Sequence, residues 1–122
     1  MKKINFKKLV IIFLIILGII LVFTLVDYIT HSLSEEYAVP GYYYRNKVIF
    51  GTLIGLITYI LIRKLKWYYK AVIFSAVVST LLQARYYIEG YAKDFVLLFL
   101  GLHFLMLIVI SLIVFRAGKK YL

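Results

Sequence analysis

The chain has 122 residues, of which 65% are hydrophobic and 16% are charged, and it contains no cysteine. A soluble domain usually has about 25% charged residues, and a domain this short buries only a modest part of its surface. The composition therefore predicts a membrane protein, and it excludes disulfides, thiolate metal sites and thiol redox chemistry. The formal net charge of +10 is typical of the basic residues that orient a membrane protein, so we expect membrane lipids and no nucleic acid as partners.

The first expected transmembrane helix covers residues 9–29 and follows a short basic head. Its apolar run is longer than the apolar part of a signal peptide, so we expect this helix to stay in the protein. A polar segment, Asp27 to Gly41, comes next, and the Pro40-Gly41 pair predicts a turn.

Three further spans are expected, at residues 45–62, 71–88 and 95–115. At about 1.5 Å per residue, helices of this length approach the thickness of a bilayer core of about 30 Å. The second span is short, and we expect Arg45 and Lys47 near its start to extend toward the lipid headgroups. The sequence thus predicts an all-α integral membrane protein: a single domain over residues 1–122, folded as an antiparallel four-helix transmembrane bundle.

Charge gives the expected orientation. The two chain ends and the turn between the second and third spans carry bases and no acid: Lys2, Lys3, Lys7, Lys8, Arg63, Lys64, Lys66, Lys70, Arg116, Lys119 and Lys120. The other two connections carry every acid of the chain: Asp27, Glu35, Glu36, Glu89 and Asp94. Basic residues concentrate in cytoplasmic segments. We therefore expect a protein of the cytoplasmic membrane with both termini in the cytoplasm.

Small residues predict close packing between helices. Gly51 and Gly55 form a GxxxG pattern in the second span, and the third span has serines and alanines at the spacing of one helical face. Either these two helices form the centre of the bundle, or their small residues join copies of the chain. Because four helices enclose little space, we expect a homo-oligomer or a larger membrane complex.

The polar residues of the spans are expected in the outer half of the bundle. A rise of about 1.5 Å per residue places His103 roughly 12 Å and Gln83 roughly 7 Å below the outer surface, with Arg85 and Asp27 shallower. These four residues predict an outward-facing ligand pocket above an inner half that is nearly pure hydrocarbon. Two structural alternatives stay open. Asp27 caps its helix or pairs with Arg85, and His103 is a neutral residue bonded to Ser79 or Gln83.

A second constellation includes Asp27, His31 and Glu35, which are spaced four residues apart. If the first helix continues past the membrane, the three share one face, and with His103 they form a candidate site for a divalent metal ion. The same stripe is also a candidate proton relay. The simpler interpretation of His31, Glu35 and Glu36 is a solvated loop.

No motif indicates an enzymatic reaction, because the chain has no GxSxG, HExxH or P-loop pattern. We expect a non-enzymatic transporter-like or accessory module with an outward-facing polar pocket. One alternative is a metal-assisted membrane enzyme that acts on a lipid-linked substrate at the outer leaflet, with Glu35 or Glu36 as the base. The other is a structural subunit of a larger membrane complex.

Overall fold

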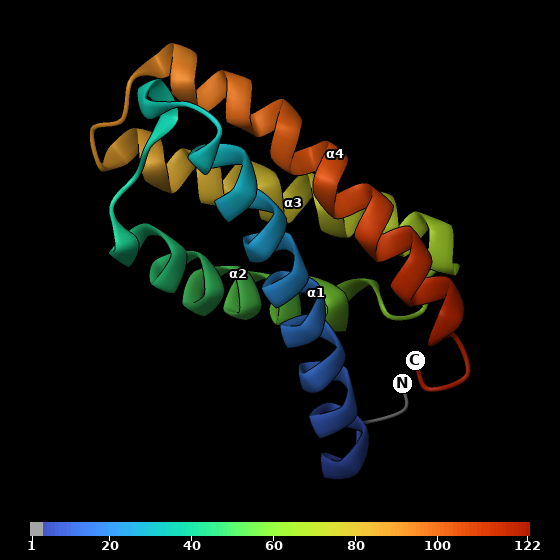
Figure 1. The fold of residues 1–122 in the computed structure, drawn as a ribbon. Coiled ribbons are helices and arrows are strands. Elements are labelled where there is room, and N and C mark those ends of the chain that lie inside the picture. The colour runs from blue at the N-terminus through green and yellow to red at the C-terminus, as the bar shows by residue number, and fades with distance from the viewer. Residues whose placement is uncertain (1–3) are drawn as a thin grey trace.

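The structure, a computed structural model, describes residues 4–122, so Lys2 and Lys3 of the basic head lie outside the described residues. Within this range the fold is all-helical (Figure 1), with α1 (Phe6–Ser32), α2 (Gly41–Ile62), α3 (Trp67–Ile88), α4 (Lys93–Ala117) and a short 3₁₀ helix, η1 (Glu35–Tyr37). Each of the four α-helices is long and apolar enough to cross a membrane. The prediction of an all-α fold with four helices that could span a membrane is therefore confirmed.

The helix ends follow local sequence signals. The Asn5 side chain caps α1 by accepting a hydrogen bond from the Lys8 amide, 2.7 Å away. At the end of α3, Gly90 has a φ of +103°, and its amide bonds to the Tyr87 carbonyl while the Tyr91 amide bonds to Tyr86. This is the Schellman motif, which ends the helix with a glycine in the left-handed conformation that other residues avoid. It lets α4 begin only a few residues later.

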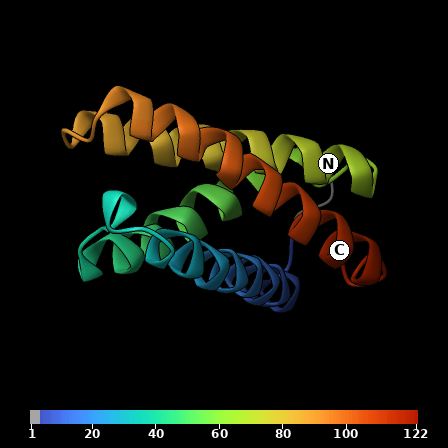
Figure 2. The same ribbon diagram turned by 45° about the horizontal axis from the view of Figure 1, so that its top comes forward.

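The four helices pack in ring order, with the most extensive packing between α3 and α4. Figure 2 shows α3 and α4 side by side in one layer and α1 and α2 in the other. In Figure 1 the α1–α2 and α3–α4 connections lie toward one end, and the start of α1 and the C-terminal residues lie toward the other. We call the first the acidic end (η1 and residues 89–94) and the second the basic end (residues 63–66 and 116–122).

Each helix buries one stripe of side chains at three- and four-residue spacing. The stripe of α1 consists of Ile12, Ile16, Ile19, Ile20, Phe23, Asp27 and His31. The stripe of α4 consists of Val96, Phe99, His103, Leu107, Ser111 and Phe115. The outer faces expose large apolar side chains such as Leu25, Ile57 and Leu105, which suits contact with lipid. The buried stripes are apolar except where they bring charged and polar side chains together.

Gly55 provides a first test of this packing. A Cβ atom built on Gly55 lies 2.9 Å from Cε2 of Phe74 on α3 and 3.1 Å from Cγ2 of Ile16 on α1. Overpacking of this kind costs about 1–3 kcal/mol. We expect Gly55→Ala to lower the free energy of unfolding by about that amount, measured by denaturant titration in mixed micelles with circular dichroism.

Gly101 on α4 is the matched control, because a Cβ built there meets nothing within 4 Å. Alanine is favoured over glycine in a helix by about 1 kcal/mol. We expect Gly101→Ala to be as stable as the wild type or more stable. Equal losses in both variants would contradict the close approach of α2 to α1 and α3.

Candidate functional site

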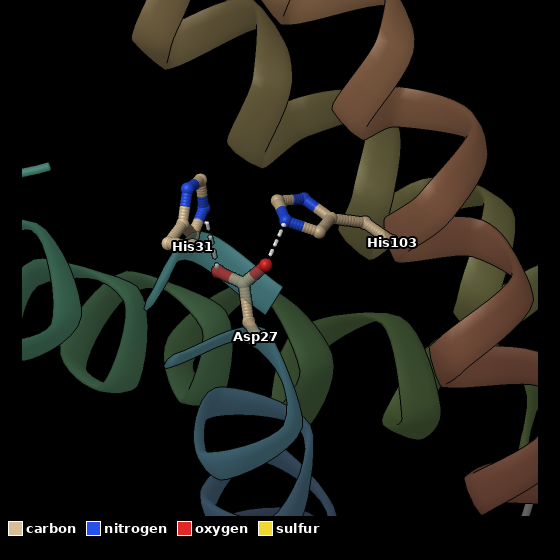
Figure 3. Close-up of side chains that lie close together, drawn as sticks. All are labelled: Asp27, His31 and His103. Atoms are coloured by element: carbon tan, nitrogen blue, oxygen red, sulfur yellow. Dashed lines mark hydrogen bonds and ion pairs between the residues drawn. The ribbon is translucent and has the colours of Figure 1, made fainter. Parts of the chain in front are cut away.

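A carboxylate lies buried in the bundle toward the acidic end, surrounded by groups that donate or exchange protons. Asp27 is 0% exposed, and His31, Lys47 and His103 around it are 0–1% exposed. Figure 3 shows both imidazole rings directed at the Asp27 carboxylate, His31 from the same helix and His103 from α4. We call Asp27, His31, Tyr43, Lys47 and His103 the Asp27 cluster.

Three helices position this cluster. Asp27 and His31 stand four residues apart on the buried stripe of α1, because α1 continues to Ser32 and such a pair shares one helical face. Tyr43 and Lys47 belong to the buried stripe of α2. His103 is separated from Asp27 by 76 residues in the sequence.

The Asp27 carboxylate has partners on both oxygens. Nε2 of His103 lies 2.8 Å from Oδ1, and Nε2 of His31 lies 3.3 Å from Oδ2. The Lys47 ammonium forms an ion pair with Oδ2. A buried charge without a partner is costly in a membrane, and Lys47 provides the compensating charge.

Lys47 itself is enclosed by the cluster. Its Nζ donates to the Tyr43 hydroxyl, 3.1 Å away, and lies 3.2 Å from Nε2 of His103. It also lies 4.4 Å from the centre of the Tyr43 ring and 4.9 Å from that of Phe23, which adds cation–π attraction. With both histidines neutral, Asp27 and Lys47 leave the cluster without net charge.

Nε2 of each histidine lies near both a donor and an acceptor. It can therefore be bonded whether or not it carries a proton. Nδ1 of His31 lies 2.6 Å from the Tyr37 carbonyl, and because a carbonyl only accepts, Nδ1 carries a proton. Nε2 of His31 then accepts from the Tyr43 hydroxyl at 3.3 Å or, when protonated, donates to Asp27. Nε2 of His103 likewise donates to Asp27 or accepts from Lys47. Among the described residues, the buried Nδ1 of His103 has no hydrogen-bond partner.

Aromatic rings hold the histidines in place. The His31 ring stacks on Phe99, with ring centres 4.2 Å apart and planes 9° apart. Phe23 meets the His103 ring edge-on at 5.1 Å. These contacts fix both imidazoles against Asp27 and exclude bulk water from the carboxylate.

A pocket of about 430 Å³ opens at the acidic end, lined by Glu36, Tyr37, Ala38, Tyr91, Ala92, Asp94, Phe95 and Leu98. It adjoins the Asp27 cluster through the segment that bonds His31, because Tyr37 lines the pocket and its carbonyl meets Nδ1 of His31. Burial and the nearby Tyr42 and Glu89 raise the pKa of the Tyr91 hydroxyl. That hydroxyl therefore stays protonated as a donor at the pocket wall.

Three of the predicted site residues lie outside the cluster. Gln83 is buried, but its side-chain amide donates to the Val96 carbonyl at 2.8 Å and so joins α3 to α4. Arg85 pairs with Glu89 at 2.9 Å and is 31% exposed, so the alternative in which Asp27 pairs with Arg85 is wrong. Glu35 is exposed in η1, because α1 ends at Ser32 before the stripe reaches it.

Lys47 is the residue that sequence reasoning missed. We expected it to extend toward the headgroups, whereas it is 0% exposed and bonded to Asp27. A signal was present, because Tyr43, Lys47, Gly51 and Gly55 recur every four residues on one helical face. The GxxxG pattern predicts that this face packs against another helix, and Lys47 lies on the same face.

The half of the bundle toward the basic end is less apolar than expected. The hydroxyls of Ser75 and Ser111 lie 3.0 Å apart between α3 and α4. Nearer the basic end, Nζ of Lys70 donates to the Tyr59 hydroxyl at 2.8 Å. Buried hydroxyls and an amine therefore continue the polar interior beyond the Asp27 cluster.

The cluster meets one requirement of a metal site. Asp27, His31 and His103 each offer one ligand atom, and these atoms lie within 4.8 Å of one another. However, the Lys47 ammonium contacts both Asp27 and His103, so it already lies where a cation would be coordinated. A metal ion needs Lys47 to move away before it binds.

Comparison of the chain with protein-family models, curated proteins and solved structures finds no match. Function is therefore inferred from the Asp27 cluster: from its chemistry, its burial and its position near the pocket at the acidic end.

Proposed function

We propose that the protein is a small membrane transport module that passes protons through the Asp27 cluster. The observation that carries this proposal is a fully buried carboxylate bonded to a lysine and two histidines from three helices. Ionisable groups within membrane helices are costly and typically mark ion pathways and proton relays. A purely structural ion pair does not need two histidines with alternative partners.

The bundle is antiparallel in this proposal, with both termini in the cytoplasm. The absence of acids from the basic end of the described residues supports that orientation, since basic residues concentrate on the cytoplasmic side. The acidic pocket then faces outward, and its Glu36 and Asp94 carboxylates attract protons and other cations.

Proton transfer follows the hydrogen bonds. A proton that reaches Nε2 of His31 passes to Asp27 Oδ2. Rotation of the carboxyl group then brings the protonated oxygen to Nε2 of His103, which accepts the proton when the ring's other proton is on Nδ1. Imidazole then releases a proton from Nδ1 on the far side of the ring. Ser79, the Ser75–Ser111 pair and the Tyr59–Lys70 pair are buried polar groups farther toward the basic end.

A test compares proton flux into vesicles that contain the purified full-length chain and an internal pH-sensitive dye. We expect wild-type protein to dissipate an imposed pH gradient. The double variant Asp27→Asn/Lys47→Met removes both buried charges together and should reduce the flux to that of protein-free vesicles, because neither replacement exchanges a proton.

The matched control is Glu89→Gln, which removes a carboxylate whose partner is Arg85 at the surface. We expect its flux to equal that of the wild type. Wild-type vesicles that hold the gradient as long as protein-free vesicles would refute the proposal, and so would equal flux from the double variant.

A second candidate function is the metal-assisted membrane enzyme, favoured by the ligand atoms of Asp27, His31 and His103 within 4.8 Å. Its expected bases, Glu35 and Glu36, are exposed in η1. The ammonium of Lys47 opposes this candidate, because it occupies the coordination position in wild-type protein.

A further inference from the structure

A second pocket lies at the basic end of the molecule, away from the Asp27 cluster. It has a volume of about 510 Å³ and is lined by Leu65, Lys66, Trp67, Tyr68, Lys70, Phe115, Lys119 and Leu122. The α2–α3 turn, the start of α3 and the C-terminal residues therefore build it together. Three lysines and five apolar or aromatic side chains share one cavity.

No acidic side chain among residues 4–122 lies at this pocket to neutralise its positive charge. The five acids of the chain lie in the Asp27 cluster, in η1 or at residues 89–94. Lys66 and Lys119 are exposed, and the one hydrogen bond from Lys70 goes to the Tyr59 hydroxyl, a neutral group. Arg116 adds a further cation, 5.7 Å from the centre of the Trp67 ring.

The start of α3 adds to the positive potential. Lys66 precedes the helix without a side-chain cap, and the first turn contains no acid. The first amide groups of a helix carry partial positive charge. The lysines therefore gather around a helix end that also favours an anion.

The lining specifies the kind of anion. Leu65, Phe115 and Leu122 line the pocket together with the three lysines, so the pocket suits a group that is anionic at one end and apolar at the other. Trp67 and Tyr68 are the residue types found at membrane–water interfaces. We infer that this pocket binds the headgroup phosphate of an anionic phospholipid, with the acyl chains against Leu65, Phe115 and Leu122.

The chain carries its own reporter for this inference, because its single tryptophan, Trp67, lines the pocket. In nanodiscs that contain the full-length protein, brominated lipids quench tryptophan fluorescence at short range. We expect brominated phosphatidylglycerol, as a minor component in phosphatidylcholine, to quench Trp67 more than brominated phosphatidylcholine at the same fraction. A lysine near the surface contributes about 1 kcal/mol, so Lys119→Gln should lower this preference about fivefold.

Lys64→Gln is the matched control, since it removes an exposed charge at the same end from a residue that does not line the pocket. We expect it to keep most of the preference. Equal quenching by the two brominated lipids, or equal losses in Lys64→Gln and Lys119→Gln, would overturn the inference. An equally strong fluorescence change with inorganic phosphate in detergent would assign the pocket to the free anion and overturn the lipid assignment.

Discussion

Substitution of Lys47 by methionine should destabilise the protein by about 3–5 kcal/mol, the cost of leaving a buried charge without its partner. Methionine keeps the length and much of the volume of lysine but removes the ammonium that pairs with Asp27. Asp27 then has only the two histidines as partners in an apolar interior. Denaturant titration in mixed micelles measures the loss of unfolding free energy.

The double variant Asp27→Asn/Lys47→Met separates the ion pair from other packing effects. Removal of both charges leaves no unpaired ion, and such replacements are often close to neutral. We expect the double variant to be more stable than either single variant, with a coupling energy of about 2 kcal/mol or more. Additive losses from the two substitutions would show that Asp27 and Lys47 do not depend on each other.

The second large effect is a gain of metal binding. In Lys47→Ala the cation position beside Asp27 and His103 is free, while the three ligand atoms within 4.8 Å are retained. Carboxylate and imidazole ligands suit zinc, and the ion restores the lost positive charge. We expect zinc to stabilise this variant by about 2.7 kcal/mol when its concentration is 100 times the dissociation constant. Thermal unfolding with and without zinc measures the gain.

Wild-type protein and the double variant Asp27→Asn/Lys47→Ala are the controls. We expect zinc to stabilise neither, because the first retains the ammonium and the second lacks the carboxylate. Equal stabilisation of the wild type would show that Lys47 does not hold the cation position, and it would favour the metal-assisted candidate. Zinc stabilisation that persists without Asp27 would place the ion elsewhere.

The fold class and the helices could be predicted from the sequence because their causes are local. Length and apolar composition predict four spans, and the structure contains four helices of that kind among its described residues. The boundaries were less predictable. Residues 9–29 were expected in the first span, whereas α1 covers Phe6–Ser32, because helical hydrogen bonds continue through polar residues when their neighbours bury them. This extension carries His31 into the interior.

The candidate site could be predicted only in part. The sequence identified Asp27, His31 and His103 as chemically suitable residues. The sequence did not identify Lys47 as their partner. Lys47 and Arg45 both stand near the start of the second span, yet Lys47 is buried and Arg45 is exposed. Two residues on one helix differ by their angular position, so the packing of α2 against its neighbours decides which one turns inward.

Hydropathy and charge are properties of short segments, so they are enough to predict four apolar helices and an asymmetry of charge between the two ends. Which polar groups meet depends instead on how the helices pack. Asp27 lies 20 residues from Lys47 and 76 from His103 in the sequence, and no local pattern links groups at such separations. Their convergence follows from helix packing, where desolvation forces each buried charge to find a partner on another helix.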